Sequence, residues 1–206
     1  MMITAGLIAV VGTPMAMTYR VLTDASAVPP VPLYVSVPAP PAGRPVQVAT
    51  TRPVAPPTHL DIEAIGVSAP ITQVGLDPGG VIEPPPLEET NLVGWYGLGP
   101  SPGEVGPAVL LGHVDTRTGP AVFARLRELR PQSLITITHS DGTREMFLVE
   151  RVEKVAKTSF PTAKVYGATA DAEVRIITCG GVFDHQARSY ADNVIVYASL
   201  QKQTGT

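Results

Sequence analysis

From residue 59 onward, short apolar runs rich in Val, Ile and Thr alternate with stretches of turn-forming residues. Runs of about four to eight such residues are typical of strands rather than of helices. They predict a mostly all-β domain, either a barrel or a sandwich. The expected strands are residues 59–67, 69–76, 108–114, 133–140, 143–155, 173–179 and 192–200.

Two turns and one helix interrupt these strands. Asp77-Pro78-Gly79-Gly80 predicts a turn after the second strand, and Asp141-Gly142 is a strong signal for a two-residue hairpin. A helix is expected between Pro120 and Pro131, because the apolar residues of this segment fall on one helical face. Those residues are Val122, Phe123, Leu126 and Leu129.

The chain before residue 59 has a different composition. Residues 1–20 are mostly apolar and have no charge before Arg20, which is near the lower limit for a helix that crosses a bilayer. Residues 21–58 are rich in proline and predict an extended linker. We therefore expect a membrane segment at 1–20, a linker at 21–58, a globular domain at 59–200 and a short tail at 201–206.

The apolar segment has two interpretations. It is either an uncut single-pass anchor, which we favour, or a secretory signal that is cleaved after the small residues Ala25-Ser26-Ala27. Both interpretations place the globular domain outside the cell membrane. The proline-rich linker is also compatible with a ligand for proline-binding modules, although a spacer fits the rest of the chain better.

Overall charge and cysteine content restrict the possible functions. The 206 residues carry 15 Lys and Arg and a formal net charge of −3, so no basic stripe is available for a row of phosphates. Nucleic acid is therefore not an expected partner. The only cysteine, Cys179, can form neither an internal disulfide nor a CxxC metal site.

Cys179 ends a predicted buried strand and is followed directly by Gly180-Gly181. This position suits a nucleophile, since the glycines allow the backbone of a substrate to approach closely. The alternative is an inert buried thiol, because free cysteine is among the most buried residue types.

A thiol nucleophile needs a base, and four histidines are available. His113 is the best candidate because it also ends an apolar strand, directly after Gly112. His185 lies on the loop after the cysteine and is the second choice. His59 and His139 are expected at the surface.

Two other patterns do not indicate the sites that they resemble. Gly99 to Gly103 matches G-x-S-x-G, but the residues that follow cannot open a helix, so the segment is expected to be a loop. His113-x-Asp115 supplies two potential zinc ligands without the third and fourth that a site needs. We expect no metal and no cofactor.

Several of these motifs together resemble the sortases of Gram-positive actinobacteria. The resemblance covers nearly the whole domain, and Gly180 to Asp184 is most similar to the class F branch, with class E as its neighbour. The motifs are Leu111 to Asp115, Gly119 to Phe123, Ile177-Thr178-Cys179 and Asp192 to Val196.

The resemblance implies an eight-stranded β-barrel and a transpeptidation reaction. Cys179 would attack an LPxTG-like sorting signal of a surface protein and form a thioester, which an amine of a cell-wall precursor would resolve. His113 would act as acid and base, and Arg188 best matches the family arginine that stabilises the oxyanion. Three residues are supporting candidates for the substrate site: Thr178, Asp115 and Arg117.

Two alternatives remain. One is an inactive sortase-like module that binds surface peptides without cleaving them. The other is a different cysteine acyltransferase of the cell wall, such as an L,D-transpeptidase, although the Ser-His-Gly-x-x-Cys sequence of those enzymes is absent.

Overall fold

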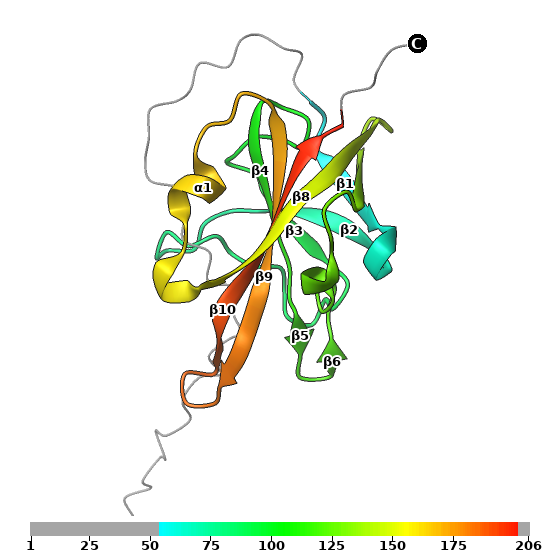
Figure 1. Cartoon of the computed structure of the whole chain (residues 1–206). Helices are drawn as coiled ribbons and strands as arrows, with labels where there is room; N and C mark the ends of the chain where they lie inside the picture. Colours follow the sequence, from blue (N-terminus) through cyan, green and yellow to red (C-terminus); the bar gives the residue numbers. More distant parts are fainter. Residues whose placement is uncertain (1–53, 202–206) are drawn as a thin grey trace, which may run out of the picture. The chain divides into compact units, whose positions relative to one another are not determined.

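The computed structural model describes residues 54–201, which form a closed eight-stranded barrel (Figure 1). The order of the strands around the barrel is β1-β2-β3-β4-β9-β10-β8-β7. This confirms the predicted fold class, with a barrel rather than a sandwich. The strands are β1 (Pro57–Ile62), β2 (Val67–Val74), β3 (Val93–Tyr96), β4 (Gly106–Leu111), β7 (Leu134–His139), β8 (Arg144–Ala156), β9 (Ala172–Asp184) and β10 (Ser189–Leu200).

Short elements connect these strands. A small separate hairpin follows β4, and single helical turns follow β1 and β8. The described residues contain one α-helix, α1, which lies between β8 and β9. The elements are β5 (Asp115–Thr116), β6 (Gly119–Pro120), η1 (Glu63–Ile65), η2 (Leu126–Glu128), η3 (Lys157–Ser159) and α1 (Thr162–Tyr166).

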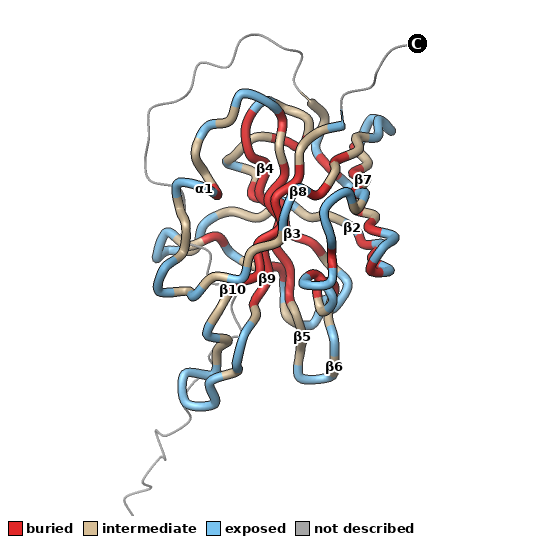
Figure 2. The backbone as a smooth tube through the Cα atoms, viewed as in Figure 1, coloured by how far each residue is buried: buried red, intermediate tan, exposed pale blue. Residues whose placement is uncertain are grey.

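Two apolar clusters hold the barrel together. The larger cluster includes Leu60, Phe147 and Val196 and forms the core, seen as the buried central segments in Figure 2. The smaller cluster contains Leu111, Ile177 and Cys179. Because successive strand residues point to opposite faces, Val174 and Ile176 of β9 belong to the first cluster, whereas Ile177 and Cys179 belong to the second.

The expected helix between Pro120 and Pro131 is wrong. The segment forms consecutive tight turns that end in the 3₁₀ helix η2, with hydrogen bonds such as Leu126 N–H to the Phe123 carbonyl. Each bond spans three residues, which is the 3₁₀ and turn pattern. The four apolar side chains are still buried, so their spacing reported burial and not an α-helix.

The strands also differ from the prediction in several places. The expected strand 59–67 is divided, because β1 starts at Pro57 and η1 separates it from β2. Strand β3, which pairs with β2 and β4, was not expected from the sequence. Finally, β9 does not end at Cys179 but continues to Asp184, because Gly180, Phe183 and Asp184 pair with β10.

The turn at Asp77 is confirmed, and Asp141-Gly142 does lie in a hairpin, although four residues, 140–143, separate β7 from β8 instead of the predicted two. Asp77 accepts backbone hydrogen bonds from Gly79 and Val81 through its side chain and from Gly80 through its carbonyl. Gly142 has a φ of 82°, and its N–H donates to the His139 carbonyl in the β7–β8 hairpin. This left-handed conformation explains why glycine occupies the turn.

The expected membrane segment and most of the linker lie outside the described residues. Within residues 54–201, no helix is long and apolar enough to cross a membrane. The position of residues 1–20 relative to a bilayer therefore stays a prediction from the sequence.

Candidate active site

Cys179 lies on β9 at the end of the barrel where two hairpins extend together, β5–β6 and β9–β10 (Figure 1). Its side chain is only 3% exposed. Asn193 of the neighbouring strand β10 is the residue paired with Cys179. The thiol therefore lies within two paired strands, and not at the end of a strand as the sequence predicted.

His113 reaches the same region from β4, the other neighbour of β9. The two strands are parallel with Leu111 opposite Ile177, so His113 and Cys179 each follow this pair by two residues. Thr178 fixes the junction, because its hydroxyl donates to the Gly112 carbonyl at 2.8 Å. The two candidate catalytic residues thus occupy equivalent positions on neighbouring parts of the chain.

The imidazole of His113 is 4% exposed and already has a partner. Its Nε2 lies 2.8 Å from the carbonyl oxygen of Pro85, in the connection between β2 and β3. A carbonyl can only accept, so Nε2 carries the proton in this contact. In the neutral ring, Nδ1 is then the basic nitrogen.

A cavity of about 990 Å³ opens beside the thiol. It lies between the two hairpins and the turns before β7, so residues distant in sequence form its walls. His113 is not one of the lining residues and instead lines a smaller cavity of about 390 Å³ with Pro85 and its neighbours. Residues that line the larger cavity include Asp115, Phe123, Thr178, Cys179, Gly181 and Tyr190.

Opposing effects act on the ionisation of Cys179. Burial raises the pKa of the thiol above its ordinary value of 9.0, and this is the largest effect. The positive charge of Lys157 and a hydrogen bond from its side chain lower the pKa of Cys179, whereas the negative charge of Asp115 raises it. The net result is a raised pKa, so the resting thiol is mainly protonated at neutral pH.

The side chain of Asp115 bonds to Tyr190. Its Oδ2 accepts a short hydrogen bond from the hydroxyl of Tyr190, and its buried Oδ1 has no hydrogen-bond partner in the described part of the chain. Burial and the contact with Asp115 raise the pKa of Tyr190 to about 12. Asp115 and Thr178 both line the cavity, and their contact with a substrate stays a prediction.

The two loop arginines are exposed. Arg188 lies in the turn between β9 and β10, with a left-handed φ of 48°, and Arg117 lies in the turn between β5 and β6. Neither lines the larger cavity. The cavity wall instead includes Arg127, Arg130 and Arg151, which sequence reasoning did not select.

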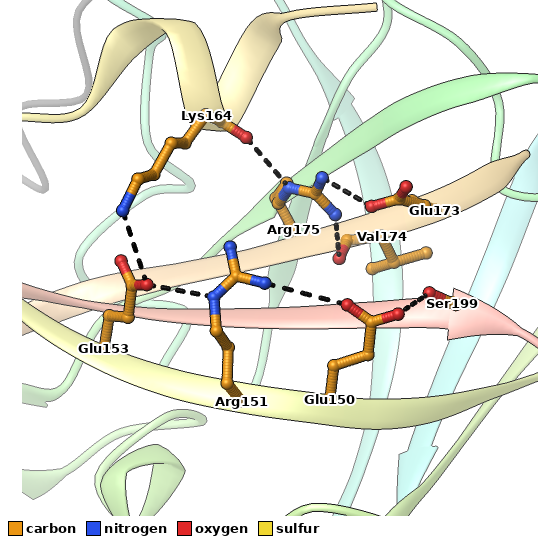
Figure 3. Close-up of polar contacts among 8 residues, drawn as sticks. All are labelled: Glu150, Arg151, Glu153, Lys164, Glu173, Val174, Arg175 and Ser199. Atoms are coloured by element: carbon orange, nitrogen blue, oxygen red, sulfur yellow. Dashed lines mark hydrogen bonds and ion pairs between the residues drawn. The ribbon is translucent and has the colours of Figure 1, made fainter. Parts of the chain in front are cut away.

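Arg175 belongs to a separate polar cluster (Figure 3). Its guanidinium forms an ion pair with Glu173, donates to the carbonyls of Lys164 and Val174, and lies over the ring of Tyr197. The side chain is 4% exposed. Arg175 therefore has a structural environment and no access to the thiol.

The remaining histidines are partly as expected. His185 is exposed in the β9–β10 turn and packs edge-on against Phe183, and the side chain of His59 is 39% exposed beside Ser68. The surface position predicted for His139 is wrong. Its side chain is 2% exposed and its Nδ1 contacts the Ala55 carbonyl, because residues before β1 cover the end of β7.

Two residues beside the thiol were missed from the sequence. Lys157 contacts Cys179 from η3, a position that the strand pattern alone does not place near β9. Asn193 is fully buried opposite Cys179, and neither polar atom of its amide has a hydrogen-bond partner among residues 54–201. A polar residue inside an apolar strand was the available signal for Asn193.

The patterns set aside in the sequence are also located. The segment Gly99 to Gly103 is a loop, in which the backbone N–H of Ser101 bonds to Glu104 and its hydroxyl donates to the Ala55 carbonyl. Within residues 54–201, no three His, Cys, Asp or Glu side chains are grouped so that they could hold a metal ion.

Comparison with known proteins gives one family. A family model described as the sortase domain matches residues 60–201. A lid mutant of sortase A from Corynebacterium diphtheriae is 19% identical, with a TM-score of 0.56 and coverage of 73% of each chain. Sortase C-1 from Actinomyces oris is 20% identical, with a TM-score of 0.56 and coverage of 71% of this chain and 74% of that one.

A third solved structure is similar. It is sortase C1 from Streptococcus agalactiae in a complex with MTSET, at 18% identity and a TM-score of 0.55, covering 72% of this chain and 69% of that one. At these identities the solved structures show the common fold alone. The comparison with curated proteins gave no match.

Proposed function

The chain belongs to the sortase family, and on that premise we propose that it is a cysteine transpeptidase that cleaves a sorting signal through a thioester on Cys179. Sortases are transpeptidases, so family membership supports the general reaction. The observation that carries the residue assignment is the register of β4 and β9, which brings His113 and Cys179 to equivalent positions, with Cys179 in the wall of a substrate-sized cavity.

In the proposed reaction, the thiolate of Cys179 attacks the carbonyl carbon of a Thr–Gly bond. The bond to the glycine nitrogen breaks after His113 protonates that nitrogen, and the acyl group remains on sulfur as a thioester. An amine then attacks the thioester, loses its proton to His113, and forms a new amide while the thiol is regenerated. Both steps pass through an oxyanion, for which Arg188 is the proposed donor.

The substrate class follows from the resemblance. The donor is a surface protein with an LPxTG-like C-terminal signal, and the acceptor is an amine of a cell-wall precursor. The resemblance of Gly180 to Asp184 favours class F, with class E as its neighbour. The mixed lining of the cavity, with apolar Phe123 and Leu129 and polar Thr178, is compatible with a peptide that has both kinds of side chain.

We also propose that residues 1–20 hold the enzyme at the cell membrane, with the barrel outside. The apolar composition of residues 1–20 and the proline-rich spacer support this arrangement. Membrane fractionation followed by external protease treatment tests it. Release of the barrel by cleavage near residues 28–58 is expected, whereas a free protein that begins near Val28 would indicate a cleaved signal instead.

The decisive experiment uses the full chain, LPxTG-like peptides and an amine acceptor, with product identified by mass spectrometry. Wild-type protein should cleave the peptide and transfer the acyl part to the amine. Cys179→Ala should abolish both reactions but keep the fold and measurable peptide binding, because the thioester has no other possible attachment site. Turnover by this variant would contradict the cysteine mechanism, and binding without cleavage by the wild type would indicate an inactive module.

A further inference from the structure

The thiol of Cys179 poses an electrostatic problem that the catalytic histidine does not solve in this structure. The side chain is almost fully buried, and burial disfavours a thiolate. The Nε2 of His113 is directed to the carbonyl of Pro85, in a different cavity from the one beside the thiol. A cation in contact with the sulfur would counteract the effect of burial.

Lys157 is in that position. It is the first residue of η3, directly after β8 ends at Ala156, and β8 pairs with β10 up to this end through Ala156 and Asp192. Its Nζ donates to the Ser189 hydroxyl at 2.8 Å, and its side chain also hydrogen-bonds to Cys179. The ammonium group therefore connects the start of β10 to the nucleophile on β9.

The other groups around the sulfur do not replace this charge. Asp115 acts in the opposite direction, because its carboxylate raises the pKa of Cys179. Tyr190 is neutral at physiological pH, since its own pKa is raised to about 12. The amide of Asn193 is uncharged, and Arg188 is exposed in the turn. The groups that act on the sulfur or lie beside it are Asp115, Lys157, Tyr190 and Asn193, with His113 at the end of the neighbouring strand. Arg127, Arg130, Arg151 and Lys154 also line the cavity, but Lys157 is the cation whose charge and hydrogen bond lower the pKa of Cys179.

We propose that Lys157 is a catalytic residue whose ammonium group, held by Ser189, stabilises the thiolate of Cys179. Lys157 keeps its protons and forms no covalent bond. The thiol proton goes to His113 or to solvent, and the negative charge on sulfur is then balanced by the adjacent cation. The same donor remains beside the sulfur when the thiolate leaves the resolved thioester.

This inference deepens the proposed function, because it assumes that Cys179 is the nucleophile. It does not depend on the substrate. The chain has a single cysteine, so a thiol reagent reports on Cys179 alone, without any peptide. A failure of the peptide assay and a failure of this inference are therefore distinguishable.

The test is the rate of alkylation of the full chain by iodoacetamide between pH 5 and about 11. An opposite charge near an ionisable group changes its pKa by about 1–3. In Lys157→Met, the midpoint of the rate curve should therefore move up by about one pH unit or more, with a roughly tenfold lower rate at neutral pH. Lys157→Arg should stay close to the wild type because it retains the charge.

The matched control is Lys164→Met. Lys164 is exposed on α1 and forms an ion pair with Glu153, so its replacement removes one positive charge from the same region without touching the thiol. Its rate curve should coincide with that of the wild type. An equal displacement in Lys164→Met and Lys157→Met would overturn the proposal, as would an unchanged curve in Lys157→Met.

A fourth variant covers the case in which Lys157→Met does not fold, as judged by circular dichroism. Ser189→Ala removes the hydroxyl that holds Nζ but leaves the charge, and should move the midpoint upward by a smaller amount than Lys157→Met. If Ser189→Ala is folded and the midpoint of its rate curve does not move, Ser189 does not hold the ammonium group beside the thiolate and the proposal is wrong. Lys157→Arg separates the two explanations further, because lost packing alone would not be rescued by arginine.

Discussion

The hydrogen bond from His113 to Pro85 determines which imidazole nitrogen is available for proton transfer. Because Nε2 donates to a carbonyl, Nδ1 is the nitrogen that can take a proton in the neutral ring. The β2–β3 connection holds this arrangement by contact, since Pro85 is buried against Gly94 of β3. A side chain at position 94 would displace Pro85, so the packing here requires a glycine.

The first prediction concerns the identity of the acid and base. Replacement of His113 by Ala should lower the rate of peptide cleavage by about 100- to 10,000-fold, because both proton transfers lose their catalyst. His185→Ala is the control. The rate of this variant should stay near that of the wild type, because the side chain of His185 is exposed in the β9–β10 turn. Steady-state kinetics with a fluorogenic peptide measure both. The opposite ranking would transfer the role to His185.

The second prediction concerns the oxyanion. Arg188→Lys should cost about 2–4 kcal/mol of transition-state stabilisation, since lysine cannot reproduce the two parallel donors of a guanidinium. Because Arg188 is exposed in the turn, it can stabilise the oxyanion only if it moves toward the thiol when substrate binds. The loss should therefore appear mainly in kcat.

Two arginines provide controls for Arg188. Arg117→Lys changes an exposed turn residue and should leave kcat unchanged, and a large effect there would assign the role to the other hairpin. Arg175→Lys should instead lower the free energy of unfolding, because a buried ion pair and two hydrogen bonds are disturbed. Thermal unfolding distinguishes this structural effect from a catalytic one.

Among the elements, the turns at 121–129 are the unusual feature. They close one end of the barrel with apolar side chains and, through Phe123, lie against the residues that follow β4. A Cβ built on Gly112 would lie 2.7 Å from side-chain atoms of both Val122 and Phe123. The glycine therefore permits the close approach that brings these turns beside His113.

The third prediction tests this packing. Gly112→Ala should destabilise the domain by about 1–3 kcal/mol, because the added methyl forces displacement of a packed aromatic ring. Gly75→Ala is the matched control, since nothing lies within 4 Å of its Cβ position. Urea unfolding followed by fluorescence of Trp95 measures both variants. Equal stability of the two would mean that the turns adjust without cost.

The β9–β10 hairpin also depends on a glycine. Gly181 has a φ of 79°, and its added Cβ would lie 2.3 Å from a side-chain oxygen of Asp192. The pairing of the two strands shifts between Tyr190 and Asp192, beside this position. The irregularity allows the strands to continue past Cys179 and bring Tyr190 into the wall of the cavity.

At the scale of the whole molecule, the cysteine thiol and four tyrosine hydroxyls keep their protons to higher pH in the folded state than in the unfolded chain. Burial raises the pKa of Cys179 above 9.0 and, with Asp115, raises that of Tyr190 to about 12. The pKa values of Tyr96, Tyr166 and Tyr197 are also raised, mainly through burial. The unfolded chain therefore loses these protons at lower pH than the folded chain does.

The fourth prediction is the resulting alkaline instability. Since the folded state binds more protons in this range, the free energy of unfolding should fall as the pH rises from about 9 to about 12. Thermal unfolding at successive pH values measures the decline. Tyr190→Phe and Cys179→Ala should each make it shallower. A stability that stays constant or increases above pH 9 would contradict the assigned burial.

Several features of this protein follow from its sequence because they depend on local pattern. Runs of β-branched and other apolar residues predicted the barrel strands other than β3, and the turns at Asp77 and Gly142 required only backbone geometry. Cys179 is the candidate nucleophile from sequence because it is the only cysteine and ends an apolar run. His113 followed from its matching strand-end position, together with the family resemblance.

Other features required the tertiary structure, because they depend on contacts between distant segments. The burial of His139 arises from residues near Ala55, and the 3₁₀ turns replace an α-helix because they fit the end of the barrel. Lys157 meets Cys179 only because β8 and β9 both pair with β10. Strand alternation encodes which side chains are buried, but only the closure of the barrel decides which polar groups meet at the thiol.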